Sequence, residues 1–154
     1  MARVKQMGAT TEKEVSILLV EDNPRDVALT LELFNEAKIE NAIHVVNDGV
    51  QAMEYLHQQM ERREGVPDLI LLDLNLPRLD GREFLKRLRK EDGLRSIPVA
   101  VLTSSAADED VLMSYNLDAD CYVTKPVDIH QIMKIIESID GFGISMVRVR
   151  KAPT

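Results

Sequence analysis

Five short apolar runs alternate with longer segments of helical periodicity along the chain. Each run is rich in Val, Ile or Leu and is followed by polar or turn-forming residues, which is typical of buried strands. The segments between and after the runs place apolar side chains three or four positions apart, as amphipathic helices do. The pattern therefore predicts five strands separated by helices. The predicted strands are residues 17–20, 43–46, 69–72, 99–102 and 121–123.

The first predicted helix has a clear start, because Asn23 is a good N-cap and Pro24 suits the first helical position. A charged stretch at residues 58–65 is expected to lengthen the connection from the second helix to the third strand. The apolar residues that define the five helices are Val27, Leu31 and Phe34; Ala52, Leu56 and Met60; Phe84, Leu85 and Leu88; Val111, Leu112 and Tyr115; and Ile129, Ile132, Met133, Ile136 and Ile139.

The predicted strands are apolar without alternation, which indicates that both faces of the sheet are buried. Strands that are separated by helices favour right-handed parallel crossovers. We therefore expect an α/β fold of the flavodoxin-like kind: a doubly wound, five-stranded parallel sheet with strand order 2-1-3-4-5 and helices on both faces.

A chain of 154 residues has room for one domain with a proper core. We expect a flexible lead-in at residues 1–15, the folded domain at 16–140, and a C-terminal extension at 141–154. Apolar residues in the extension, Phe142 and residues 144–149, have no evident place in a five-strand core. Such a surface usually meets a partner, so a homodimer or another protein contact is expected there.

The composition excludes several classes of partner and compartment. A formal net charge of −7 argues against nucleic acid as the main partner, because phosphate contacts need clustered Lys and Arg. No apolar run approaches the roughly 20 residues that span a bilayer, so no membrane association is expected. Cys121 is the one cysteine, which favours core packing in a reducing compartment, and we expect a cytoplasmic protein.

The chemistry-bearing residues follow the predicted strands. Glu21 and Asp22 follow the first strand, Asp73 the third, Thr103 the fourth and Lys125 the fifth. Open parallel sheets place their ligand sites at the carboxyl ends of the strands, near the switch in strand order. Each residue alone has an ordinary structural explanation, but a charged or hydroxyl group after four of five strands is rare by chance. We therefore expect these side chains to converge.

Three converging carboxylates need positive charge. Two carboxylates ~5 Å apart repel by roughly 3 kcal/mol at an effective dielectric constant of about 20. Lys125 supplies one charge and a divalent cation would supply two. Oxygen ligands and an incomplete protein shell favour Mg²⁺. A carboxylate, Mg²⁺, a lysine and a hydroxyl together suit phosphoryl transfer, with Asp73 as the nucleophile.

Four motifs resemble the response-regulator receiver family of two-component signalling: VEDNP, LLDLNLP, VLTSS and CYVTKP, in this order over residues 16–139. The resemblance implies that Asp73 is the phosphoacceptor and that Asp22 and Asp73 bind Mg²⁺ directly. It further implies that Glu21 acts through metal-bound water and that the backbone carbonyl of Asn75 completes the protein ligands.

The resemblance also assigns the remaining residues and the partners. Thr103 and Lys125 would bind phosphoryl oxygens, Thr103 and Tyr122 would form the switch, and a cis peptide is expected between Lys125 and Pro126. The partner would be a histidine kinase. The stretch at 58–65, the CYVTKPVD segment and the lack of an output domain are most similar to small regulators of phytochrome-type kinases. Such a protein is a signalling phosphoacceptor and not an enzyme.

Other functions fit the residues less well. A dehalogenase-like phosphatase needs a second Asp where this chain has Asn75. A flavodoxin-like cofactor binder needs a hydroxyl- and glycine-rich loop after the first strand, whereas Glu21 and Asp22 would repel a flavin phosphate. A phosphorelay intermediate stays open as an alternative to a terminal regulator. Metal binding by His44, His57 and His130 is not expected, because they lack ligand spacing.

Overall fold

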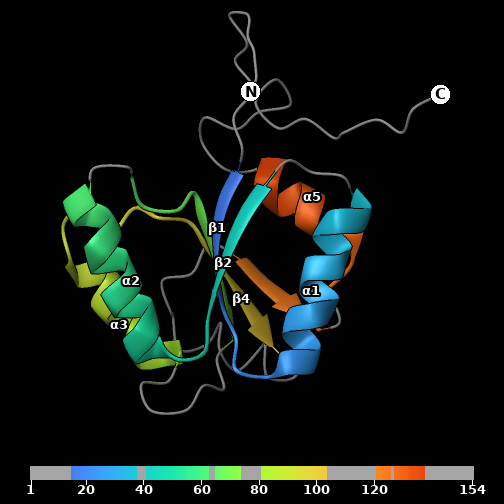
Figure 1. Cartoon of the computed structure of the whole chain (residues 1–154), viewed down its shortest axis with the longest axis horizontal. Helices are drawn as coiled ribbons and strands as arrows, with labels where there is room; N and C mark the ends of the chain where they lie inside the picture. Colours follow the sequence, from blue (N-terminus) through green and yellow to red (C-terminus); the bar gives the residue numbers. More distant parts are fainter. Residues whose placement is uncertain are drawn as a thin grey trace, which may run out of the picture.

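Five parallel strands form one sheet in the computed structural model, which describes residues 15–37, 41–62, 65–73, 81–103, 121–125 and 127–137 (Figure 1). The strand order is β2-β1-β3-β4-β5, so the predicted doubly wound α/β fold is confirmed. The strands are β1 (Val15–Val20), β2 (Asn41–Val46), β3 (Leu69–Asp73), β4 (Val99–Thr103) and β5 (Cys121–Thr124).

Helices cover both faces of the sheet, as Figure 1 shows: α1 and α5 lie on one side, and α2 and α3 lie on the other. The fourth helix expected around Val111, Leu112 and Tyr115 falls outside the described residues. The described helices are α1 (Pro24–Ala37), α2 (Gly49–Arg62), α3 (Gly81–Lys90) and α5 (Ile129–Glu137).

The core consists of two apolar layers, one on each face of the sheet, and strands β3 and β4 are buried throughout. Alternate residues of β1 supply both layers: Leu18 packs in the layer under α2 and α3, and Leu19 in the layer under α1 and α5. Burying one such side chain stabilises the fold by roughly 1.5–3 kcal/mol. The central strands are thereby fixed, and their carboxyl ends are held side by side.

Two element boundaries differ from the sequence-based expectations. Strand β1 begins at Val15, whose side chain is buried, two residues before the predicted start of the strand at residue 17. Residues 58–62 were expected in the connection but belong to α2, which continues to Arg62; Gln59 is half-buried and the other four residues are exposed. Leu31 and Met60 are each 39% exposed.

The physical reason for the exposure of Leu31 is the angular position of the residue on α1. The buried face of this helix is centred on Phe34 and Thr30, and a residue turned by about 100° from Thr30 lies at the rim. Met60 lies one turn beyond the buried Leu56, where α2 meets the α3–β4 connection at Gly93.

In the part of the chain that the structure describes, no helix is long and apolar enough to cross a membrane.

Candidate functional site

The acidic pair Glu21 and Asp22 is fixed between the end of β1 and the start of α1. The Glu21 backbone N–H donates to the carbonyl of Val46 at 3.0 Å, which continues the β1–β2 pairing by one residue. Asn23 caps α1 as predicted, since its Oδ1 accepts from the Arg25 N–H at 2.9 Å. The Asn23 N–H also donates to Glu21 Oε2 at 3.3 Å. Glu21 is thus held in place by both elements.

Asp73 meets this pair because β3 runs beside β1. Val20 pairs with Leu72, so the residues that follow them leave the sheet next to each other. Glu21, Asp22 and Asp73 each offer a carboxylate oxygen, and these oxygens all lie within 4.8 Å of one another. Glu21 and Asp73 are buried whereas Asp22 is exposed. The cluster therefore has one side open to solvent.

Thr103 and Lys125 close the site from β4 and β5. Thr103 is the last residue of β4, and it is buried. The backbone N–H of Lys125 donates to the Thr103 carbonyl at 2.7 Å, so the residue after β5 stays tied to the sheet. Lys125 Nζ lies 2.8 Å from Glu21 Oε1 and 3.7 Å from Asp73 Oδ2. One ammonium thus contacts two members of the carboxylate cluster.

Burial and like charge perturb the ionisation of Glu21. Loss of solvent raises the pKa of this carboxyl from 4.5 to about 7; the hydrogen bond from Lys125 opposes the rise, and the proximity of Asp73 adds to it. Burial alone would lower the pKa of Lys125, but its hydrogen bonds to Glu21 and Asp26 and the charge of Asp73 outweigh this effect and raise the pKa. The lysine is therefore charged at neutral pH.

The residues of the cluster fit a divalent cation. Among the described residues, Lys125 contacts two of the three clustered carboxylates, Glu21 and Asp73, and it is shared with Asp26, so its one positive charge does not balance the ionised cluster. Carboxylate oxygens are the ligands that hard divalent cations prefer. The exposed carboxylate of Asp22 leaves such an ion a path to solvent and to water ligands.

Four of the sequence-predicted site residues are brought together here: Glu21, Asp22, Asp73 and Lys125. Thr103 reaches the same edge of the sheet through its backbone contact with Lys125. Asn75 and Pro126 lie outside the described residues. Tyr122 is half-buried on β5 and packs against the core layer under α2 and α3.

Sequence reasoning missed Asp26, which lies in the first turn of α1 and not at a strand end. Its Oδ2 accepts from Lys125 Nζ at 2.9 Å. A signal was present in the sequence: Asp26 is four residues after Asp22, and only Arg25 separates it from the N-cap and the proline. Acidic residues are common in a first helical turn because the helix dipole favours them, so this position drew no functional interpretation.

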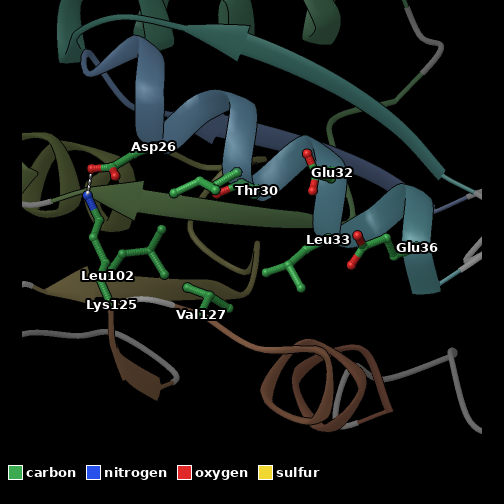
Figure 2. Close-up of a pocket in the computed structure, with 9 residues that line it drawn as sticks. Asp26, Thr30, Glu32, Leu33, Glu36, Leu102, Lys125 and Val127 are labelled. Carbon is green, nitrogen blue, oxygen red and sulfur yellow. Dashed lines mark hydrogen bonds and ion pairs between the residues drawn. The ribbon is translucent and has the colours of Figure 1, made fainter.

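Lys125 also borders a pocket that runs along α1 (Figure 2). The pocket has a volume of about 450 Å³. Figure 2 shows Asp26 and Lys125 joined at one end of it, while Glu32 and Glu36 lie further along the helix. Its apolar lining includes Leu33, Leu102 and Val127. The lysine therefore connects the carboxylate cluster with the space between α1 and the segment after β5.

Solved structures with this fold include phytochrome-associated regulators. The bacteriophytochrome response regulator RtBRR matches with a TM-score of 0.77 and 42% identity, over 92% of this chain and 85% of that one. The phosphorylated cyanobacterial phytochrome response regulator RcpA matches with a TM-score of 0.65 and 40% identity, over 80% and 89%.

A third relative is the response regulator Rcp1 of Synechocystis sp. It is 40% identical over 137 residues, which are 88% of this chain and 93% of Rcp1. The Mn²⁺-bound form of Rcp1 matches the structure with a TM-score of 0.64, over 89% of this chain and 99% of that one. The sequence profile of the response regulator receiver domain matches residues 17–137. The chain belongs to the family of response regulator receiver domains.

Proposed function

We propose that Asp73 accepts a phosphoryl group from the phosphohistidine of a histidine kinase, in a reaction that needs Mg²⁺. A carboxylate oxygen of Asp73 attacks the phosphorus, and the bond between phosphorus and the histidine nitrogen breaks. Family membership supports this activity for the chain, and the phosphorylated form of RcpA is a relative in which the modification is present.

The observation that carries the proposal is the position of Lys125 beside Asp73. The ammonium lies 3.7 Å from Asp73 Oδ2 at the solvent-open carboxylate cluster. Positive charge at that place favours a carboxylate that is to become a doubly charged acyl phosphate. Lys125 and Thr103 are proposed to bind the phosphoryl oxygens.

The same cluster supplies the proposed Mg²⁺ ligands. Asp22 and Asp73 would bind the ion directly, Glu21 would act through bound water, and the backbone carbonyl of Asn75 would add a further ligand. When bound, Mg²⁺ neutralises the charge that develops on the phosphoryl oxygens during transfer. The Mn²⁺-bound form of Rcp1 supports a divalent ion in this type of site, and Mg²⁺ is our proposal for this chain.

Substitution of the acceptor tests the proposal. Asp73→Asn should abolish acid-labile labelling by acetyl phosphate with Mg²⁺, because the amide oxygen is a poor nucleophile. Asp92→Asn is the matched control, since Asp92 is an acidic side chain that is 92% exposed in the α3–β4 connection. Labelling of Asp73→Asn at the wild-type level would contradict the proposal. Intact-protein mass spectrometry before and after acid treatment gives the readout.

We further propose a phytochrome-type histidine kinase as the phosphodonor. The similarity to RtBRR and RcpA over most of the chain supports this choice. Transfer from an autophosphorylated phytochrome-type kinase should be at least tenfold faster than transfer from an unrelated histidine kinase at equal concentration. Equal rates would contradict this assignment. The proposed place of the reaction is the cytoplasm, and the proposed role is that of a signalling phosphoacceptor without a separate enzymatic activity.

A contact through the C-terminal extension is a separate proposal. Apolar side chains at Phe142 and residues 144–149 support a role for residues 141–154 in a homodimer or in binding the kinase. Deletion of residues 143–154 should reduce the sedimentation mass or slow transfer from the kinase. If the deletion changes neither quantity, the extension takes no part in these contacts.

A further inference from the structure

The carboxylate of Asp26, which is not a member of the carboxylate cluster, binds the ammonium of Lys125. Asp26 Oδ2 accepts from Lys125 Nζ at 2.9 Å, and Glu21 Oε1 accepts at 2.8 Å. Asp73 Oδ2 is 3.7 Å away, which is beyond hydrogen-bonding distance for this pair. The ammonium therefore donates to Glu21 and Asp26, while its contact with Asp73 is an ion pair without a hydrogen bond.

Donor counting shows what this position means for a phosphoryl group on Asp73. A lysine ammonium has three N–H donors. Two of them are used by Glu21 and Asp26, and a phosphoryl group offers three strong acceptor oxygens. The third N–H can serve one phosphoryl oxygen, but a contact with a second phosphoryl oxygen needs a donor that Glu21 or Asp26 now uses.

Burial decides which contact gives way. The Glu21 side chain is 1% exposed, so a carboxylate left there without its cation would carry a large desolvation penalty. The Asp26 side chain is 29% exposed, and water can solvate it after the lysine has left. Figure 2 places Asp26 at the end of the pocket along α1, beside the lysine. The Asp26 contact is thus the less costly one to break.

We propose that Asp26 is a positioning residue that competes with the phosphoryl group for Lys125. In the unphosphorylated protein Asp26 holds the ammonium back from Asp73, and phosphorylation replaces the Asp26–Lys125 pair with a phosphoryl–Lys125 pair. The inference rests on the proposed role of Asp73 as acceptor. It assigns a function to a residue of α1 that is neither an acceptor nor one of the proposed metal ligands.

Competition predicts that removal of the Asp26 charge favours binding of a phosphoryl mimic. The probe is beryllofluoride, titrated in the presence of saturating Mg²⁺. Asp26→Asn and Asp26→Ala should each tighten binding at least threefold relative to the wild type. Glu32→Gln is the matched control, since Glu32 is an exposed acidic residue of α1 that lines the same pocket six residues further on. It removes the same formal charge and should change the affinity less than twofold.

The same substitutions in Lys125→Ala protein separate competition for the lysine from a general effect of charge. In Lys125→Ala protein the lysine is gone, so Asp26→Asn should alter beryllofluoride affinity no more than Glu32→Gln does. An Asp26→Asn effect of full size in that background would overturn the inference. Equal effects of Asp26→Asn and Glu32→Gln in protein that retains Lys125 would overturn it as well.

Lysine NMR gives a readout that does not depend on phosphoryl chemistry. In metal-free protein with ¹⁵N-labelled lysine, Asp26→Asn should shift the Lys125 Nζ resonance and Glu32→Gln should leave it unchanged. An unshifted resonance in Asp26→Asn would overturn the inference. If beryllofluoride does not bind the wild type, the proposed role of Asp73 fails and this inference with it. If it does bind, failure of the two comparisons overturns the role of Asp26 alone.

Discussion

Glu21 shows how a single buried carboxyl links protonation to metal binding. Its side chain is 1% exposed, and burial raises its pKa to about 7, with Lys125 opposing the rise and Asp73 adding to it. The folded state therefore holds a proton that the unfolded state releases near pH 4.5. This contribution to the stability of the metal-free protein is complete below about pH 4.5 and is lost as the pH rises through about 7.

The same ionisation predicts the pH dependence of Mg²⁺ binding. The proposed binding of Mg²⁺ through water held by Glu21 favours the carboxylate form of that residue, so we expect binding to release a proton below about pH 7. We expect the affinity for Mg²⁺ to rise about fivefold between pH 6 and pH 7 and about tenfold between pH 6 and pH 8, and to level off above pH 8, because the ionised fraction of a group with a pKa of about 7 rises in this way. Calorimetric titrations at these three pH values provide the measurement. Glu21→Gln should bind with an affinity that is flat over this range. A flat profile in the wild type would contradict the prediction.

At the scale of single residues, most of the site could be predicted from the sequence, because ligand sites of parallel sheets lie at the carboxyl ends of the strands. This rule predicted that Glu21, Asp22 and Asp73 converge, since each follows a strand of one parallel sheet. The contact of Asp26 with Lys125 was not predictable in the same way. It depends on the angle at which α1 packs against the sheet, and tertiary packing sets that angle. The roles assigned to these residues remain predictions until the variants are measured.

The elements themselves begin and end at local signals, and α5 is the clearest example. Asp128 Oδ1 accepts from the Gln131 N–H at 2.9 Å, and Gln131 Oε1 accepts from the Asp128 N–H at 3.0 Å. This reciprocal arrangement is a capping box, with Asp128 at the N-cap. It fixes the N-cap of the helix three residues after Lys125, and α5 begins at the next residue, Ile129.

The capping box predicts the effect of a substitution on stability. Asp128→Ala removes the acceptor for the Gln131 N–H and should lower the free energy of unfolding by about 1 kcal/mol. Asp128→Ser keeps a hydroxyl that can accept the same bond and should recover most of the loss. Urea denaturation followed by circular dichroism measures both variants. Equal stability of Asp128→Ala and wild type would show that the box contributes nothing in solution.

Strand positions and order were predictable at this scale, because fully apolar runs between helices admit few arrangements. The buried faces of the helices were less predictable from the sequence. Leu31 fits the apolar periodicity of the first helix, but its exposed position follows from the rotation of α1 about its own axis. Residues 58–62 were expected to belong to the connection because most of their side chains are polar. The exposed end of a surface helix carries polar side chains as well, so polarity alone could not separate the two.

At the scale of the whole molecule, the arrangement of Thr103 and Tyr122 suggests how phosphorylation reaches a surface. Tyr122 pairs with Val101 across β4 and β5, and both side chains belong to the core layer under α2 and α3. Thr103 is two residues beyond Val101 on β4, so its side chain points to the same face of the sheet. The hydroxyl and the aromatic ring are thus diagonal neighbours on adjacent strands.

We expect phosphorylation of Asp73 to draw the Thr103 hydroxyl toward the phosphoryl oxygens and to vacate space that the half-buried ring of Tyr122 can enter. The populations of two ring positions should then shift with a coupling free energy of typically about 1–3 kcal/mol. Thr103→Ala lacks the hydroxyl, so it should still be labelled at Asp73, more slowly, but lose most of the response at Tyr122. Fluorotyrosine NMR, with the signal assigned by Tyr122→Phe, measures that response with and without acetyl phosphate. Thr124→Ala is the control. It removes the hydroxyl of the β5 residue that pairs with Thr103, and it leaves the Thr103 hydroxyl in place. An equal response of Tyr122 in wild type and Thr103→Ala would show that the position of the ring does not depend on the Thr103 hydroxyl. Phosphorylation would then have to change the surface through other residues.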